Sequence, residues 1–371
     1  MSAHPLLTPF RMGKITLKNR VVMAPLTRMR ADNPENAPTD LHVDYYRQRA
    51  SAGLIISEGI AISPQGYGWA GTPGLWSKAQ LRGWQKVTDA VHEAGGRIVA
   101  QLWHTGAVSH PDLQDGRRPV APSQVNVMHE SVTPGGRVPT VDPRPMTLEE
   151  IDATVGDFAV AARNAMDVGF DGVQIQANYL YLIAQFLNKA TNRRTDIYGG
   201  PLEGRARFLF DVVDAVLLGV DPGRVGVKIG PMHEGGPFAA NDETLPVAEY
   251  AVRELEAYGL SHLLMMGALN DFSGTPLEHL AGDGMFEHFR PLFRGTFIAN
   301  SNMDLDRANR LVTAGAADLV AFGRPYIANP DLVERFAAGT PLAEPDWTTV
   351  YGDGARGYTD YPVSAPAEAL A

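Results

Sequence analysis

Short runs of β-branched and aliphatic residues recur along the whole chain, separated by longer amphipathic or polar stretches. Eight of these runs have the length and apolar content of buried strands. They cover residues 20–25, 53–57, 97–102, 172–176, 224–229, 261–266, 296–300 and 318–322. Eight is the number of strands in a closed parallel barrel.

Several of the runs follow a helix-like segment that stops at glycine, as in VTDAVHEAGGRIV and ANRLVTAGAADLV. Glycine commonly ends helices because it adopts the left-handed conformation without steric cost. Repeated helix, glycine and strand units imply a parallel sheet. Eight of them without a seam favour closure over an open, doubly wound sheet. We therefore expect an α/β protein with a single (β/α)8 TIM barrel domain over residues 1–371.

One long connection interrupts this regular series. Residues 105–146 are rich in Pro and Gly, and they separate the third run from a helix that the capping box Thr147-x-x-Glu150 begins. In a barrel this insertion would lie at the C-terminal rim, over the site where such proteins carry their chemistry. A surface excursion without a role fits the composition equally well.

The composition of the chain excludes several classes of partner and several kinds of reactive site. The chain has 42 acidic and 32 basic residues, and a net charge of -10 argues against nucleic acid or anionic membranes as partners. It has no cysteine, which excludes disulfides, thiolate metal sites and cysteine nucleophiles, and the histidines lack metal-ligand spacing. Redox chemistry here requires a bound cofactor. The sequence also lacks a signal segment and an apolar stretch of the roughly 20 residues that a membrane span needs, so we expect a cytoplasmic protein.

Barrel enzymes carry their active sites at the C-terminal strand ends. Polar or small residues stand in or just after seven of the eight runs: Thr27, Gly59, Gln101, Trp103, Tyr179, Tyr181, Lys228, Ser301 and Asn302, and the Gly323-Arg324 pair. Backbone N–H groups and a guanidinium after the last two strands are suited to hold a phosphate. The sequence therefore predicts a phosphorylated cofactor.

Specific sequence motifs restrict the function further than composition and strand ends do. The segments NRVVMAPLTRMRA, SAGLIISEGIAISPQGYG, GRIVAQLWHTGAVSHPDLQ and TNRRTDIYGGPLEGRARFL, followed by ADLVAFGRPYIANPDLVERF and YGDGARGYTDYP, closely resemble those of old yellow enzymes. The resemblance runs in order from about residue 6 to residue 362. It implies a barrel that holds FMN noncovalently, takes hydride from NADPH or NADH and reduces a small α,β-unsaturated substrate. A monomer or a homodimer is expected.

The resemblance also implies roles for individual residues. The isoalloxazine ring would be lined by Pro25, Leu26, Thr27, Gly59 and Gln101, and the phosphate held by Ser301, Asn302, Gly323 and Arg324. Thr27 stands where one branch of the family has a redox-tuning cysteine. Trp103 and Tyr351 would border the substrate cavity. Lys228 departs from the usual arginine that faces flavin N1 and O2, which keeps the charge but not the bidentate guanidinium contact.

A second departure lies in the fourth strand. The family commonly has H-x-x-N-x-Y there, and this chain has Gln176-x-x-Tyr179-x-Tyr181. In the family the first two residues bind the substrate carbonyl oxygen and the tyrosine protonates carbon. The amide of Gln176 and the hydroxyl of Tyr179 can still donate hydrogen bonds, and Tyr181 keeps the acid. Because side chains alternate along a strand, Asn178 is interpreted as structural.

Three hypotheses follow from this pattern. The first is an ene-reductase in which Gln176 and Tyr179 bind the acceptor oxygen and Tyr181 donates the proton. The second is a specialised FMN-dependent desaturase, isomerase or reductase of one metabolite, with weak activity on simple enones. The third is a flavin-binding protein without turnover, in which Tyr179 fills the site; the retained Tyr181 argues against it.

Overall fold

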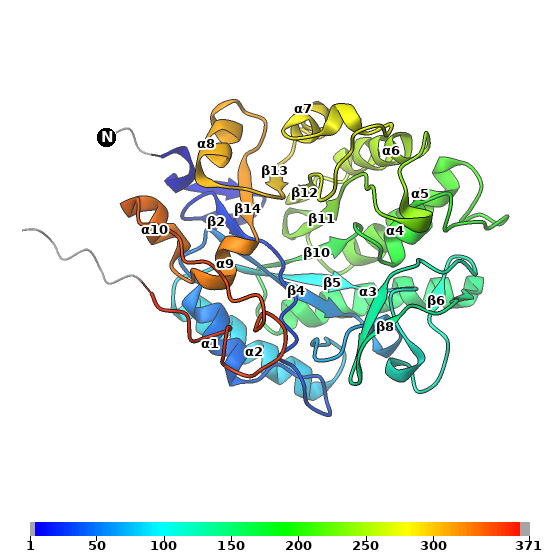
Figure 1. Ribbon diagram of the computed structural model, residues 1–371, viewed down its shortest axis with the longest axis horizontal. Coiled ribbons are helices and arrows are strands. Elements are labelled where there is room, and N and C mark those ends of the chain that lie inside the picture. The colour runs from blue at the N-terminus through cyan, green and yellow to red at the C-terminus, as the bar shows by residue number, and fades with distance from the viewer. Residues whose placement is uncertain (1–3, 364–371) are drawn as a thin grey trace, which may run out of the picture.

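Eight parallel strands close into a barrel in the computed structural model, which describes residues 4–363 (Figure 1). The strands pair in the order β10-β11-β12-β13-β14-β3-β4-β5, and β5 pairs with β10 to close the ring. Their bounds are β3 Val21–Met23, β4 Leu54–Ala61, β5 Ile98–Trp103, β10 Gly172–Gln176, β11 Val225–Ile229, β12 His262–Met266, β13 Phe297–Asn300 and β14 Leu319–Phe322. All eight predicted strands and the predicted TIM barrel are confirmed.

Helices connect successive strands and cover the outside of the barrel (Figure 1). They are α1 Asp40–Gln48, α2 Lys78–Glu93, α3 Leu148–Asp167, α4 Leu182–Leu187, α5 Leu202–Leu217, α6 Thr244–Glu256, α7 Gly284–Phe289, α8 Leu305–Thr313, α9 Arg324–Ala328 and α10 Leu332–Ala338. Helix α3 begins with the predicted capping box, in which the Thr147 hydroxyl accepts from the backbone of Glu150 and the Glu150 carboxylate accepts from the backbone of Thr147.

The interior of the barrel is closed at its N-terminal end by a hairpin of β1 (Phe10–Met12) and β2 (Ile15–Leu17). Met12, Ile15 and Leu17 are buried in one cluster with inward-facing strand residues such as Leu54 and Ile298. This apolar plug leaves the opposite, C-terminal end as the place where polar groups can face a ligand.

Strand β4 is longer than the sequence predicted. The apolar run ends at residue 57, but the strand continues to Ala61 through a register shift between Ile56 and Gly59. A bulge of this kind absorbs an extra residue and bends the strand without ending its pairing. Gly59 therefore lies within the strand, opposite Gln101 of β5, and does not follow the strand as we expected.

The insertion at 105–146 forms a small hairpin, β7 (Glu130–Thr133) with β8 (Gly136–Pro139), and a short parallel pair, β6 (Val120–Ala121) with β9 (Arg144–Pro145). The hairpin contacts the segment after β4, where the Ala70 amide donates to the Val132 carbonyl. The insertion thus lies beside the C-terminal strand ends, which is the position that the rim interpretation requires.

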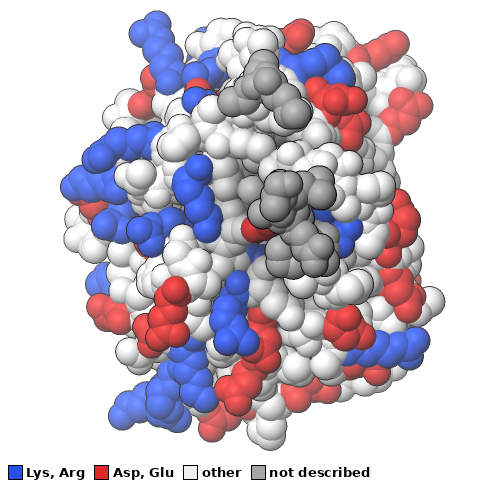
Figure 2. Space-filling model, turned by 90° about the vertical axis from the view of Figure 1, so that its left-hand side faces the viewer, with Lys and Arg blue, Asp and Glu red and all other residues white. Residues whose placement is uncertain are grey.

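The surface carries charges of both signs. On the face drawn in Figure 2, basic and acidic side chains lie among each other with uncharged areas between them. In the described part of the chain, no helix has both the length and the apolar character to cross a membrane.

Candidate active site

The strand ends surround a cavity of about 200 Å³ at the C-terminal end of the barrel. It is lined by Pro25, Thr27, Gly59, Gln101, Trp103, Gln176, Tyr179, Tyr181, Lys228 and Met266. Every lining residue except Met266 was picked out from the sequence. Because the strands are parallel, residues far apart in the chain meet here at one end of the barrel.

A second, larger cleft of about 520 Å³ continues from this cavity and shares Pro25, Lys228 and Met266 with it. It extends over the ends of β13 and β14 to the segment 342–347, where Trp347 stands at the surface. The sequence-predicted residues in this cleft are Leu26, Ser301, Asn302, Gly323 and Arg324. Together the cavity and the cleft, here called the joined cavity, form one elongated space.

The loop after β13 has an unusual backbone. Ser301 and Asn302 adopt positive φ angles of 114° and 49°. Such turns direct successive N–H groups into a concave surface that can bind an anion. Arg307 braces the loop by donating to the carbonyls of Ser301 and Asn302, while Arg324 stands 3.5 Å from the Asn302 side-chain oxygen. This end of the joined cavity suits a phosphate.

Lys228 stands where the two parts of the joined cavity meet. It pairs in register with Gln176 across β10 and β11, and its side chain is buried. Its ammonium makes no hydrogen bond or ion pair with the residues between 4 and 363, and burial lowers its pKa to about 8. A buried cation without a carboxylate partner is costly and fits a ligand that brings negative charge. Beside it, the Gln176 amide oxygen is buried and has no donor among the described residues.

Gln101 is held by a chain of polar groups inside the barrel. Its amide nitrogen donates to the Gln174 side-chain oxygen at 2.7 Å, and the Gln174 amide nitrogen donates in turn to Nε2 of His262 at 2.9 Å. Burial lowers the pKa of His262 to about 3, so the ring is neutral and Nε2 can accept. This chain fixes which end of the Gln101 amide faces the cavity.

Tyr179 and Tyr181 form an aromatic wall of the cavity. Tyr179 has a φ of +63°, a conformation that costs a bulky residue on the order of 1–3 kcal/mol. Its ring centroid is 5.5 Å from that of Tyr181, and Tyr181 stacks edge-on with Trp103 at 5.0 Å. Burial raises the pKa of Tyr179 to about 12 and that of Tyr181 well above its usual value, so both hydroxyls keep their protons.

Tyr351, which the family resemblance places at the border of the substrate cavity, is not among the residues that line this cavity. Tyr351 is 44% exposed and packs against Trp69, with ring centroids 6.2 Å apart, and Trp69 in turn packs against Trp103. Along this series of contacts, the rings of Trp69 and Trp103 therefore lie between Tyr351 and the cavity. Asn178 lines a separate hollow with Met232 and Met266.

Two further residues were not found from the sequence. Met266 ends the sixth predicted strand, so a strand-end criterion that also admits large apolar residues would have identified it. His129 lies in the insertion, and its Nε2 is 3.4 Å from the Tyr179 hydroxyl. No sequence pattern pointed to His129, because its position depends on how the insertion folds back over β10.

A closed barrel with an anion-suited loop after its last strands and an adjoining cavity at the C-terminal strand ends is typical of an enzyme with a phosphorylated cofactor. Comparison with known proteins identifies the family. Residues 5–343 match the NADH:flavin oxidoreductase / NADH oxidase family. The chain belongs to this family, the old yellow enzymes, and is an FMN-dependent oxidoreductase.

The relatives cover almost the full chain. 12-oxophytodienoate reductase 2 of Arabidopsis thaliana is 39% identical over 96% of this chain and 95% of its own length. The solved structure of morphinone reductase is 44% identical, covers 98% of both chains and has a TM-score of 0.90, and it is also known in complex with tetrahydroNAD. The old yellow enzyme homologue NCR from Zymomonas mobilis is 40% identical over 96% of this chain and 99% of its own, with a TM-score of 0.89.

Proposed function

We propose that this protein is an ene-reductase that reduces the alkene of an α,β-unsaturated carbonyl compound. The observation that carries this proposal is the meeting of Gln176, Tyr179, Tyr181 and Lys228 in one cavity. Two oxygen-binding donors, a proton donor and a cation are the groups that the reaction needs. Relatives named as reductases of 12-oxophytodienoate and of morphinone support the same reaction class.

The joined cavity fits FMN in its chemistry. Ser301, Asn302, Gly323 and Arg324 would hold the phosphate, and Pro25, Leu26, Thr27, Gly59 and Gln101 would line the ring. When bound, FMN accepts hydride from a nicotinamide nucleotide and passes it to the substrate. Lys228 would supply positive charge beside the ring, which satisfies its own buried ammonium as well.

The chain's contribution to substrate reduction comes from β10 and the turn after it. Gln176 and Tyr179 would donate hydrogen bonds to the carbonyl oxygen, which polarises the alkene and stabilises the negative charge that develops on oxygen. Tyr181 would donate its proton to the α-carbon. Its raised pKa keeps it protonated, and burial among Trp103 and Tyr179 keeps water from competing.

A second candidate function is supported by one observation. Tyr179 stands where the family has the smaller Asn, and its ring takes up part of the cavity wall. A narrower cavity with two neutral donors suits one particular metabolite, which the protein would desaturate, isomerise or reduce. This alternative predicts tight FMN binding and slow turnover of simple enones.

Anaerobic stopped-flow spectroscopy tests both candidate functions. The yellow holoenzyme is bleached with NADPH or NADH and then mixed with 2-cyclohexenone, with Tyr181→Phe as the comparison variant. Fast recolouring that slows in Tyr181→Phe supports the ene-reductase. Bleaching without recolouring supports the specialised alternative, and a purified protein without bound flavin contradicts both.

A further inference from the structure

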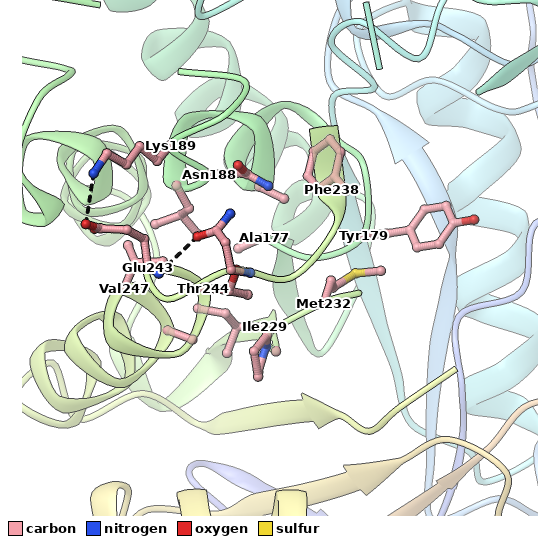
Figure 3. A pocket seen from close by; sticks show the side chains of 16 residues that line it. Ala177, Tyr179, Asn188, Lys189, Ile229, Met232, Phe238, Glu243, Thr244 and Val247 are labelled. Carbon is pink, nitrogen blue, oxygen red and sulfur yellow. Dashed lines mark hydrogen bonds and ion pairs between the residues drawn. The ribbon is translucent and has the colours of Figure 1, made fainter. Parts of the chain in front are cut away.

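The two faces of strand β10 pack against different kinds of side chain. Outside the barrel, beside helices α4 and α6, Figure 3 shows a pocket whose walls are mainly apolar, such as Ile229 and Val247. Its charged residues Lys189 and Glu243 pair with each other at 2.9 Å. Inside the barrel, Gln174 of β10 is fully buried among other polar side chains. Because burying a polar group costs free energy unless it is hydrogen-bonded, the inner arrangement calls for an explanation that packing alone does not give.

Four side chains form a continuous hydrogen-bonded series from the cavity to the start of β12, here called the inner polar chain. Gln101 Nε2 donates to Gln174 Oε1 at 2.7 Å, and Gln174 Nε2 lies 2.9 Å from His262 Nε2. On the other side of the ring, His262 Nδ1 lies 2.9 Å from Ser261 Oγ, which donates to the Val225 carbonyl at 2.9 Å. Each of the four side chains is at most 4% exposed.

The inner polar chain runs along one level of the barrel over four neighbouring strands. Gln101 of β5 pairs in register with Gln174 of β10. Gln174 pairs in turn with Gly226 of β11, and Gly226 pairs with His262 of β12. A Cβ at Gly226 would stand 2.1 Å from Cε1 of His262. Glycine therefore lets the imidazole lie across β11 and reach Gln174, and any larger residue there would interrupt the chain.

The inner polar chain has a fixed direction. The Ser261 hydroxyl has one proton and gives it to the Val225 carbonyl, so its oxygen accepts from Nδ1–H of His262. Because burial lowers the pKa of His262 to about 3, the ring is neutral and its Nε2 accepts from the Gln174 amide nitrogen. The Gln174 oxygen is thereby left to accept from Gln101. The Gln101 nitrogen points into the barrel, and its oxygen is the end left for the cavity.

We propose that Gln174 and His262 are positioning residues for the flavin ring, which present the oxygen of Gln101, and not its amide nitrogen, to the ligand. This inference rests on the proposed place of the flavin ring beside Gln101. The pyrimidine edge of a flavin carries a single N–H group, at N3, between two carbonyl groups. The Gln101 oxygen can accept that proton, whereas the amide turned around would oppose one N–H to another and leave both unsatisfied. The ligand class that the inner polar chain selects is therefore a ring with an imide N–H at this edge.

The test compares the binding of FMN and of 3-methyl-FMN, in which a methyl group replaces the N3 proton, to the FMN-free protein. Quenching of flavin fluorescence gives both dissociation constants, and their ratio measures the preference for the N–H group. Gln174→Leu breaks the chain beside Gln101, and His262→Leu breaks it one link further away. Gln174→Glu is the conservative variant, because a carboxylate oxygen still accepts from Gln101. Thr88→Val is the matched control, which removes a buried hydrogen bond to the Val168 carbonyl on helix α2.

The wild type and Thr88→Val should prefer FMN equally. We expect the preference to fall about 3- to 10-fold in Gln174→Leu, the worth of one hydrogen bond, and to stay within about twofold of the wild type in Gln174→Glu. In His262→Leu it should fall by a smaller factor than in Gln174→Leu. A preference that Gln174→Leu or His262→Leu leaves unchanged, or that Thr88→Val lowers as far, overturns the proposal. Equal losses in Gln174→Glu and Gln174→Leu do the same.

A measurement on the wild type alone covers variants that do not fold. Proton NMR of the protein loaded with FMN isotope-labelled at N3 should show an N3–H signal that exchanges with solvent more slowly than in free FMN. Exchange at the rate of free FMN contradicts the proposal. If the preference for FMN follows the inner polar chain but 2-cyclohexenone is not reduced, Gln174 and His262 keep this role and the proposed ene-reductase fails.

Discussion

The two ends of the joined cavity are built differently. At the phosphate-suited end, residues after β13 and β14 follow the family pattern, and the loop is fixed by Arg307 and its contacts to two backbone carbonyls. At the substrate end, Gln176 and Tyr179 replace the usual pair, and Tyr179 is held in a left-handed conformation with one long contact to the insertion.

The two ends therefore meet different requirements: one end binds the cofactor, and the other selects the substrate. A phosphate and a flavin ring are the same in every member of the family, so the residues that hold them serve one fixed shape. The carbonyl compound differs from enzyme to enzyme. We therefore expect changes at the substrate end to alter rate and selectivity, while changes at the other end alter FMN affinity.

The largest effect on the substrate end is expected from Tyr181→Phe. Loss of the proton donor should slow alkene reduction by about 10²- to 10⁴-fold, the usual contribution of a positioned acid. Flavin bleaching by the nicotinamide should stay unchanged, because that step needs no proton from Tyr181. Stopped-flow measurement of the two half-reactions checks this. Equal slowing of both would show that Tyr181 supports the structure and not the proton transfer.

The combined change Gln176→His and Tyr179→Asn should restore the family pair. Asn also tolerates the left-handed backbone at this position far better than Tyr does. Since one preorganised oxygen donor contributes about 10²- to 10³-fold in rate, we expect kcat/KM for 2-cyclohexenone to rise by about 10²-fold. A restored pair that leaves this value unchanged would favour the specialised reaction. FMN affinity serves as the internal control.

The sequence predicted the barrel well because each strand is a short apolar run and several of the runs follow helices that end at glycine, a pattern that local physics enforces. It also predicted seven of the ten residues around the small cavity, because strand ends in a parallel barrel converge, and the family resemblance added Pro25 and Gln176. The positions of Tyr351 and His129 could not be predicted in this way. Both lie on long connections whose course depends on tertiary packing, such as the contact of Tyr351 with Trp69.

Lys228→Met tests the junction between the two ends. Without the cation, FMN should bind about 10- to 100-fold more weakly, the worth of a charge-assisted hydrogen bond. The stability of the FMN-free protein should instead increase in this variant, because the buried cation has no negative partner there. The pKa of Lys228 is lowered from 10.5 to about 8, so the unfolded state binds more protons between these values and stability rises with pH there.

Below about pH 8 the buried charge therefore costs the FMN-free protein its full penalty, on the order of 3 kcal/mol. Lys228→Met should raise the unfolding free energy of that form at pH 7 and change it little near pH 11. Denaturant unfolding of the FMN-free protein at both pH values checks the effect on stability. Flavin titration checks the loss of FMN affinity. Lys189→Met, which removes an exposed lysine of the ion pair with Glu243, is the control.

The smallest expected effect concerns the contact between the insertion and the substrate wall. His129→Ala removes the ring that stands 3.4 Å from the Tyr179 hydroxyl. A long hydrogen bond of this kind is worth less than the usual 0.5–1.5 kcal/mol, so we expect KM for the enone to rise only about twofold to threefold. In a Tyr179→Phe background the same substitution should have no effect, because the partner hydroxyl is already gone. Additive losses in the double variant would mean that His129 acts on the substrate by another route, and the insertion would then be part of the binding site in its own right.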